Sequence, residues 1–216
     1  RVTRKTGPGR AWHSEQRSVS TIYGMNMGNE VRLYRVNDKG TLSFGEYYPA
    51  GSLQKVIVTD EDGKREETFT DNEGKTILVV SMDGNTRLET YNVYDDRGLL
   101  RYVLSPEASA QLGSSVNETV LKQLGYYFDY DVWRRMILKR LPGCDPIYMV
   151  YDKRDRLVMS QDGKQRAENI NKWSYSLYDN HNRVIEAGEV VLSEAMTREE
   201  LQNVTSGSDK YIPEGI

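Results

Sequence analysis

Aspartates that each follow a tyrosine are the first candidates for chemistry, because paired carboxylates can act as catalytic acid and base. A retaining glycosidase, for example, needs two carboxyl groups that face each other. Asp95, Asp131, Asp152 and Asp179 all stand in the same Tyr-x-x-Tyr-Asp context. A recurrent context indicates a recurrent backbone role, so we expect these acids to shape turns. A hydrolase is therefore the least favoured interpretation, and it requires a cleft with two carboxylates outside the turns.

One cysteine and two histidines complete the set of reactive side chains. Cys144 lies in a turn-like Leu-Pro-Gly-Cys-Asp-Pro run, and neither His13 nor His181 has a sequence context that proposes a base for the thiol. A single thiol closes no intrachain disulfide and makes no thiolate zinc site by itself. We expect structural roles for Cys144 and for His181, which stands in a turn, whereas His13 lies in the N-terminal segment and carries no signal. We predict no catalytic residue, no metal and no cofactor.

Tyrosine dominates the aromatic residues, with 15 Tyr against 3 Phe and 3 Trp. Eight of these tyrosines belong to four copies of one pattern, which recur at intervals of 21 to 36 residues. The copies are Tyr91/Tyr94/Asp95, Tyr127/Tyr130/Asp131, Tyr148/Tyr151/Asp152 and Tyr175/Tyr178/Asp179. Such spacing indicates one supersecondary unit with connections of variable length.

Each copy has the composition of a strand that ends in a turn, since Tyr, Val, Ile and Thr favour strands. An Asp that opens a type I turn accepts hydrogen bonds from the turn's own N–H groups. Three residues later the chain needs a left-handed residue, which Gly supplies at least cost and Asn or Asp tolerates. The pairs that fit are Asn37/Gly40, Asp60/Gly63, Asp71/Gly74, Asp95/Gly98, Asp152/Asp155 and Asp179/Asn182. The Asp131 copy places Arg134 there, so we expect another turn type for this one of about seven hairpins.

A basic residue stands four positions after the turn residue in five of these turns, as Lys64, Lys75, Arg135, Arg156 and Arg183. Such a residue can pair with the Asp across the turn or lie over a tyrosine ring of the facing strand. Tyrosines three positions apart point to opposite faces of a strand unless a bulge intervenes. We therefore expect one tyrosine of each copy to line the interior and the other to face outward.

Basic residues gather between positions 134 and 156, where seven of them stand against three acids. Arg134, Arg140, Lys153 and Arg154 form a candidate patch for an anionic ligand or partner. Exposed tyrosines beside such a patch can stack on sugar rings, so a glycan-binding surface module is the alternative function. The favoured interpretation of the cluster is a set of solvated faces and turn-pairing arginines.

Composition excludes several classes of protein. The net charge of −3 over 216 residues argues against a nucleic-acid partner. A mean hydropathy of −0.69 and the lack of a long apolar run exclude a membrane span. The chain opens at Arg1 with neither Met nor a signal-peptide core, so we interpret it as a piece of a longer protein.

The pattern along the chain predicts five regions. Residues 1–20 form a loose N-terminal segment, and residues 21–105 form β-hairpins with degenerate repeats. Residues 106–125 form a short helical excursion, in which apolar residues 116, 120, 121 and 124 mark a helical stripe. Residues 126–193 hold three repeat units. Residues 194–216 form a short helix, opened by a capping box at Thr197 and Glu200, and a tail.

The segments 130–135, 148–158 and 175–185 resemble YD repeats of the Rhs (rearrangement hotspot) family, and are most similar to Bacteroides-type cell-surface members. The resemblance covers roughly residues 30–190 and is strongest over 90–188. It implies a mainly β fold, a spiral or curved antiparallel sheet of successive β-hairpins, here with one or two short helices. In complete relatives the sheet forms a hollow shell around a toxic or otherwise processed C-terminal segment.

The family's self-cleavage motif, Asp-Pro-x-Gly, is absent, because Asp145-Pro146 is followed by Ile147 and Tyr148. No protease role is therefore implied. The favoured function is a non-catalytic structural segment of a shell on a secreted or cell-surface protein. Its expected partner is the remainder of the same polypeptide, and unpaired strand edges predict association between copies as well.

Overall fold

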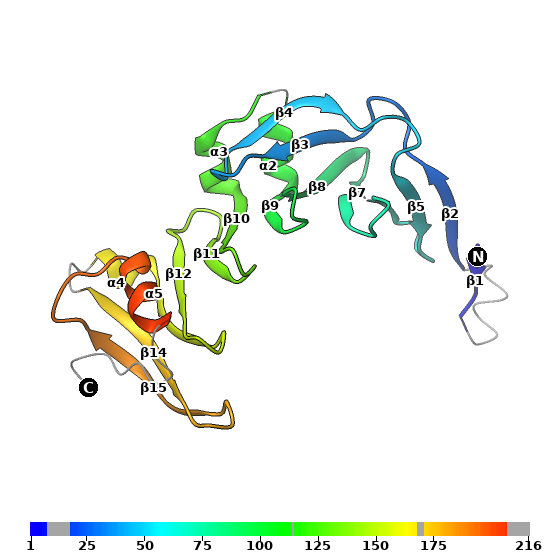
Figure 1. The fold of residues 1–216 in the computed structure, drawn as a ribbon. Coiled ribbons are helices and arrows are strands. Elements are labelled where there is room, and N and C mark those ends of the chain that lie inside the picture. Colours follow the sequence, from blue (N-terminus) through cyan, green and yellow to red (C-terminus); the bar gives the residue numbers. More distant parts are fainter. Residues whose placement is uncertain (8–17, 114, 168–170, 207–216) are drawn as a thin grey trace. The chain divides into compact units, whose positions relative to one another are not determined.

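A computed structural model describes residues 1–7, 18–113, 115–167 and 171–206, and Figure 1 shows its fold. The chain divides into two compact units, Arg1–Gly125 and Tyr126–Ile216. Strands and hairpins predominate in both units, so the predicted mainly β fold of successive antiparallel hairpins is confirmed. No helix in the described part of the chain is long and apolar enough to cross a membrane.

The first unit is an antiparallel sheet with strand order β1-β2-β5-β6-β7-β8-β9. Its strands are β1 (Arg4–Lys5), β2 (Val19–Met25), β5 (Gln54–Thr59), β6 (Arg65–Thr70), β7 (Thr76–Asp83), β8 (Thr86–Tyr94) and β9 (Leu100–Leu104). Because β1 pairs with β2, residues 1–20 are not uniformly loose, which corrects the expectation for that segment. Residues 8–17 of the segment, including His13, lie outside the described residues.

A separate hairpin, β3 (Arg32–Val36) with β4 (Leu42–Tyr47), packs on this sheet. Its Tyr34 meets Tyr91 of β8 edge to face, with ring centroids 5.2 Å apart. Phe69, Leu78 and Leu104 are fully buried beneath. The core of the first unit therefore lies between the long sheet, the β3–β4 hairpin and α2 (Pro106–Leu112), whose Ala108 and Leu112 are also buried.

The second unit is an antiparallel sheet with strand order β10-β11-β12-β13-β14-β15. The strands are β10 (Gly125–Tyr130), β11 (Met136–Arg140), β12 (Ile147–Tyr151), β13 (Leu157–Gln161), β14 (Lys172–Tyr178) and β15 (Val184–Val191). They form three hairpins, and each of them contains one tyrosine copy. Val150, Met159 and Trp173 make their core together with Leu201 of α5 (Arg198–Ser206).

All seven predicted turns share one geometry. The turn residue accepts the N–H of the residue three positions later, and its own N–H donates to the carbonyl four positions later. Arg134 adopts φ +66° and the Asp131 turn makes the same hydrogen bonds as the others, so the expectation of a different turn type is wrong. The bonds of the turn hold Arg134 in the left-handed region although it has a Cβ.

A bulge follows the turn in every tyrosine copy. The extra residue stands six positions after the Asp on the return strand, as Arg101, Ile137, Val158 and Ile185. Bulges increase the local twist of a hairpin. In the last copy Tyr175 and Tyr178 both pack against the core of the second unit, so the predicted division into one interior and one outer tyrosine fails there.

Helices are more numerous than the one or two expected. Besides α2, the chain forms α3 (Glu118–Leu124), α4 (Gly163–Ala167) and α5. The expected capping box opens α5, because Thr197 N donates to Glu200 Oε2 at 2.7 Å and Glu200 N donates to Thr197 Oγ1 at 3.3 Å. A similar reciprocal pair between Asp162 and Gln165 opens α4. The predicted tail from 207 to 216 lies outside the described residues.

Candidate functional site

The four candidate aspartates lie at turns between strands, and the turns occupy their carboxylates. Asp152 Oδ1 accepts the N–H groups of Arg154 at 2.9 Å and of Arg156 at 3.0 Å. Asp95, Asp131 and Asp179 accept the N–H groups at the same two positions. One oxygen of each carboxylate is therefore committed to the backbone, as expected for turn-forming acids.

In three of the four copies, the second carboxylate oxygen pairs with the arginine four positions later. Arg135 Nε to Asp131 Oδ2, Arg156 Nε to Asp152 Oδ2 and Arg183 Nε to Asp179 Oδ2 are each 2.7 Å. The Asp152–Arg156 pair is the most buried, with side chains 1% and 10% exposed, whereas Arg183 is 75% exposed. Each Asp thus fixes the direction of one guanidinium.

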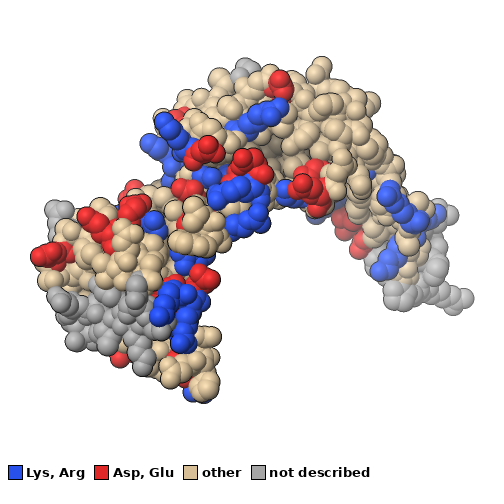
Figure 2. Space-filling model, viewed as in Figure 1, with Lys and Arg blue, Asp and Glu red and all other residues tan. Residues whose placement is uncertain are grey.

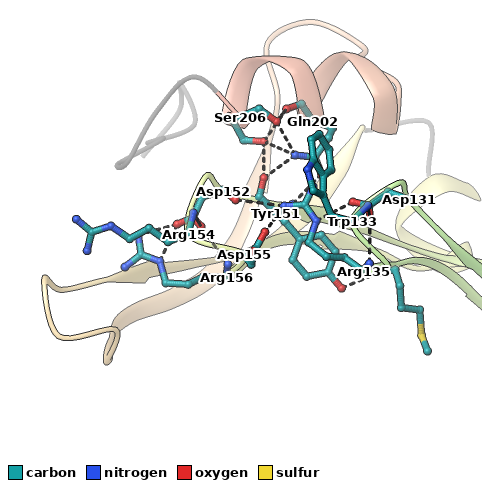
Figure 3. Close-up of polar contacts among 12 residues, drawn as sticks. Asp131, Trp133, Arg135, Tyr151, Asp152, Arg154, Asp155, Arg156, Gln202 and Ser206 are labelled. Carbon is teal, nitrogen blue, oxygen red and sulfur yellow. Dashed lines mark hydrogen bonds and ion pairs between the residues drawn. The ribbon is translucent and has the colours of Figure 1, made fainter.

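The same guanidinium reaches the next turn along the sheet (Figure 3). Arg135 Nη1 donates to the Asp152 carbonyl at 3.4 Å and to Asp155 Oδ1 at 2.8 Å. Arg156 Nη1 repeats this with the Asp179 carbonyl and Asn182 Oδ1, both at 3.2 Å. The left-handed residue of each receiving turn is an Asp or Asn, so it provides an acceptor as well as the turn conformation.

Each of these arginines also covers the second tyrosine of the next hairpin. The Arg135 guanidinium carbon lies 5.0 Å from the Tyr151 ring centroid, and that of Arg156 lies 4.9 Å from the Tyr178 centroid. The tyrosine hydroxyls donate back to the preceding hairpin, Tyr151 to the Met136 carbonyl at 2.7 Å and Tyr178 to the Leu157 carbonyl at 2.8 Å. Each of these two arginines thus lies over a tyrosine of the next hairpin. The sequence had suggested a tyrosine on the strand that faces the arginine within the same hairpin.

These contacts connect hairpins whose backbones pair only briefly. β11 and β12 pair at Leu138–Tyr148 and Lys139–Ile147, and β13 and β14 pair at Met159–Tyr175 and Ser160–Ser174. In both cases the first tyrosine of the copy stands opposite the seventh residue after the preceding turn Asp. Toward the turns, the arginine and tyrosine contacts bridge the strands. We call this set of contacts the Asp-Arg-Tyr ladder.

The first unit contains a version of the ladder built on lysine. Lys75 Nζ lies 5.7 Å from the Tyr94 ring centroid, and the Tyr94 hydroxyl donates to the Thr76 carbonyl at 3.4 Å. A Cβ added to Gly98, the left-handed residue of the receiving turn, would lie 2.8 Å from Lys75 Nζ. Leu78 stands opposite Tyr91, which is the same register as in the second unit.

Helix α5 provides a contact to the ladder that the sequence analysis missed. Gln202 Oε1 accepts the Tyr151 N–H at 3.0 Å, and the Tyr151 carbonyl accepts Gln202 Nε2 at 2.6 Å and Thr205 Oγ1 at 3.0 Å. Figure 3 shows Gln202 and Ser206 beside the Tyr151 backbone. The amide of Gln202 thus takes the place of a neighbouring strand, and no local sequence signal marks it for this role.

Two copies depart from the pattern. Leu99 occupies the basic position after Asp95, and Arg101 pairs with Asp95 Oδ2 at 3.4 Å instead. Arg101 is 3% exposed and is the extra residue of the bulge, so its role was not readable from the spacing. In the Asp131 copy, Tyr127 stacks against Arg140 at 5.4 Å, and Tyr130 N donates to Asp129 Oδ1 at 2.9 Å.

The candidate anionic patch is not one cluster. Arg134, Lys153 and Arg154 are exposed turn residues, but Arg140 lies at the other end of β11, opposite Tyr127. β11 has five residues, so about 13 Å separates its first residue from its last. On the face drawn in Figure 2, basic and acidic side chains are interspersed.

Among the described residues, the side chains of Cys144 and His181 make none of the ladder contacts. Cys144 is an exposed free thiol in a turn, and the His181 backbone N–H donates to Asp179 Oδ1 at 2.8 Å. A cavity of about 440 Å³ in the second unit is lined by Asp129, Arg166, Arg198 and Glu199, among others. Its two carboxylates lie outside the turn positions. Within the described residues no cluster of His, Cys, Asp and Glu has the arrangement of a metal site.

Titration of the ladder groups follows their surroundings. The Arg183 N–H and guanidinium, with the His181 N–H, lower the pKa of Asp179. Burial raises the pKa of Tyr151, and the Asp131 charge adds to this while Arg135 opposes it. Asp179 is therefore an anion and Tyr151 a neutral phenol at neutral pH. These are the protonation states in which an acid accepts and a phenol donates hydrogen bonds.

Comparison with known proteins shows the fold. No protein-family profile and no curated protein matches the chain. Among solved structures, a TcdB2-TccC3 crystal structure aligns with 89% of this chain at a TM-score of 0.51 and 12% identity. The Photorhabdus luminescens Tc holotoxin pore, containing a TccC3 variant, aligns with 90% at a TM-score of 0.50 and 14% identity. The β-fold is that of Tc toxin chains.

This likeness supports the Rhs-like β-fold that the YD repeats predict. At 12% and 14% identity it shows the arrangement of the backbone alone. The chain spans about a tenth of the length of these Tc toxin chains, since it covers 10% of each.

Proposed function

We propose that this chain is a non-catalytic wall segment of an Rhs-type shell, and that the wall encloses another part of the same polypeptide. The Asp-Arg-Tyr ladder carries the proposal. The same contacts, in the same register, join one hairpin to the next at Tyr151 and at Tyr178, and a lysine version does so at Tyr94. Contacts that recur between successive hairpins suit the building of a long sheet.

The mechanism of such a wall is steric. Between neighbouring hairpins of the second unit, the backbones pair at only two residue pairs. Arginine and tyrosine side chains extend the contact to the turns, and Gln202 of α5 fills the backbone positions left at Tyr151. A sheet closed in this way at each step keeps proteases and solvent from whatever lies behind it.

The use of the acids supports a non-catalytic role. In the three repeat copies of the second unit, Asp131, Asp152 and Asp179 each accept two backbone N–H groups with one oxygen and an arginine with the other. A carboxylate whose two oxygens both accept hydrogen bonds is a poor general base, because protonation would break these hydrogen bonds.

Limited proteolysis of the longer protein that contains this segment tests the proposal. Native protein is treated with proteinase K and the fragments are mapped by mass spectrometry. We expect an enclosed part of the polypeptide to survive in the native protein and to be digested after denaturation. The double change Arg135→Ala with Arg156→Ala should shorten its survival at least tenfold, and His181→Ala, a control in a turn but outside the ladder, should not. Equal digestion of native and denatured protein would refute enclosure.

We further propose a secreted or cell-surface location and a Bacteroides-type parent, both on the resemblance of the repeats alone. Protease shaving of intact cells that express the parent tests the location, since only an external protein loses its peptides. Contacts within the fold already use Tyr151, the tyrosine beside the candidate patch. Arg135 covers one face of the Tyr151 ring, and the Met136 carbonyl holds its hydroxyl. The glycan-binding alternative stays a prediction, tested by a glycan array with Tyr151→Ala and Arg154→Ala.

A further inference from the structure

One step of the Asp-Arg-Tyr ladder is incomplete in the part of the chain that the structure describes, because its arginine pairs with the turn Asp but not with a following hairpin. Arg183 pairs with Asp179 through Nε at 2.7 Å and through Nη2 at 2.7 Å, as Arg156 pairs with Asp152 through the same two nitrogens. Within the described residues, however, no tyrosine ring lies against Arg183 and no further turn accepts its Nη1. Its side chain is 75% exposed, against 12% for Arg135 and 10% for Arg156.

The strand that follows Arg183 has an open edge. In the described part of the chain, β15 pairs with β14 alone. Its Val184 and Ile185 are 56% and 66% exposed. By the rule of the other steps, the Val184 carbonyl is the acceptor for an incoming tyrosine hydroxyl, because Met136 and Leu157 hold the same position after their turns.

Within the residues that the structure describes after β15, the chain does not cover this edge. After Val191 the backbone runs to α5, whose Leu201 packs in the core and whose Gln202 binds the Tyr151 backbone on β12. Residues 192–206, which follow β15, thus return to an earlier hairpin of the same unit.

We propose that the outer edge of β15 is a docking site for a β-hairpin whose turn begins with Tyr-Asp, and that Arg183 holds it. This inference rests on the proposed function, because it extends the wall by one step. The tyrosine ring lies under the Arg183 guanidinium and its hydroxyl donates to the Val184 carbonyl. The turn carbonyl and an Asp or Asn three residues later accept Arg183 Nη1. The first tyrosine of the incoming copy pairs with Glu186, the seventh residue after Asp179.

A second copy of this chain fits the edge less well. β15 carries Glu186 and Glu189 and no basic residue. Antiparallel pairing of two β15 strands centred between Ala187 and Gly188 would set Glu186 against Glu189 of the other copy, and like charges directly opposite are destabilising. Edge association between copies, which the sequence predicts, is therefore the competing occupant in the test.

The test uses a probe made from the chain's own hairpin. The probe is a synthetic peptide with the sequence of residues 146–161, closed by a disulfide between cysteines added at its ends. It contains Tyr148, Tyr151, Asp152 and Asp155. Titration into the isotope-labelled chain should shift the amide signals of residues 183–187. Arg183→Ala should weaken binding at least tenfold, Arg183→Lys less, and the neighbouring control His181→Ala not at all.

Changes in the probe give the matching half of the experiment. Replacing its Tyr151 by Phe removes one hydrogen bond and should weaken binding several-fold, and replacing it by Ala should abolish binding. Absence of shifts at residues 183–187, or equal binding by the Arg183→Ala chain, would overturn the proposal. Shifts at the same residues on concentrating the chain alone would also overturn it, in favour of a second copy. None of these results depends on enclosure, so proteolysis of the parent protein is judged separately.

Discussion

The Arg156 guanidinium lies over the ring of Tyr178, with 4.9 Å between its central carbon and the ring centroid. Twenty-two residues separate the two, and they belong to different hairpins. Asp152 Oδ2 fixes the arginine at 2.7 Å, and the tyrosine hydroxyl anchors to the Leu157 carbonyl, the residue directly after Arg156. A turn acid thereby positions the contact between two hairpins.

Asp152→Ala should lower the free energy of unfolding of the second unit by about 3 kcal/mol. The change leaves the buried Arg156 charge and two turn N–H groups without their acceptor. Asp179→Ala is the matched control, because it removes the same contacts around an exposed arginine, and it should cost clearly less than Asp152→Ala. Urea denaturation measures both. Equal losses of unfolding free energy in the two variants would show that burial of the Asp152–Arg156 pair adds nothing to stability.

Arg134→Gly should stabilise the second unit by up to about 1 kcal/mol, because Gly adopts φ +66° without the Cβ penalty. Asp155→Gly at the same turn position should bring no net gain. Asp155 also occupies the left-handed region, at φ +60°, but its carboxylate accepts Arg135 Nη1. Asp155→Asn should leave stability unchanged, since the Asn182 side chain accepts Arg156 Nη1 in the same way at the next step. Thermal unfolding compares the three, and a loss of stability in Arg134→Gly would count against the strain argument.

Gln202→Ala should destabilise the second unit by about 2 kcal/mol, because the Tyr151 N–H loses its partner and the Tyr151 carbonyl loses one of two. Asn203→Ala, an exposed neighbour on the same helix, is the control and should change stability by less than about 0.5 kcal/mol. Hydrogen exchange at the Tyr151 amide gives the local readout. Unchanged protection in Gln202→Ala would remove α5 from the ladder.

The Asp179 carboxyl should titrate below its usual pKa of 3.8, because the Arg183 and His181 N–H groups and the Arg183 guanidinium favour the anion. A pKa that is lower in the folded state contributes stability above the unfolded value, and this contribution is lost as the pH falls through the folded pKa. Carboxyl NMR should show a partial rise of the pKa in Arg183→Ala, since the backbone donors remain. A full return to 3.8 would assign the whole effect to the side chain.

Much of the fold was predictable from local chemistry. An Asp or Asn followed three positions later by Gly, Asn or Asp marks a turn because the backbone conformation demands those residues. The Asp131 turn shows where that logic is too strict, since Arg134 adopts the same conformation within an otherwise complete set of hydrogen bonds.

The contacts between hairpins were less predictable. The spacing indicated that Arg156 would meet an acid or a ring, but sequence distance could not say that the ring belongs to Tyr178 of the next hairpin. Gln202 lies 51 residues from Tyr151 and carries no local signal. Arg101 serves Asp95 only because a bulge places it there. Such features depend on tertiary register, which local patterns do not encode.

A double-mutant cycle between Arg156 and Tyr178 tests the central claim most directly. The free energy of unfolding is measured for the original chain, Arg156→Ala, Tyr178→Ala and the double variant, with Arg156 and Tyr175 as a control pair without a direct contact. A ladder that joins hairpins predicts a coupling energy of about 1 kcal/mol for the first pair and near zero for the second. Additive losses at Arg156 and Tyr178 would contradict the account.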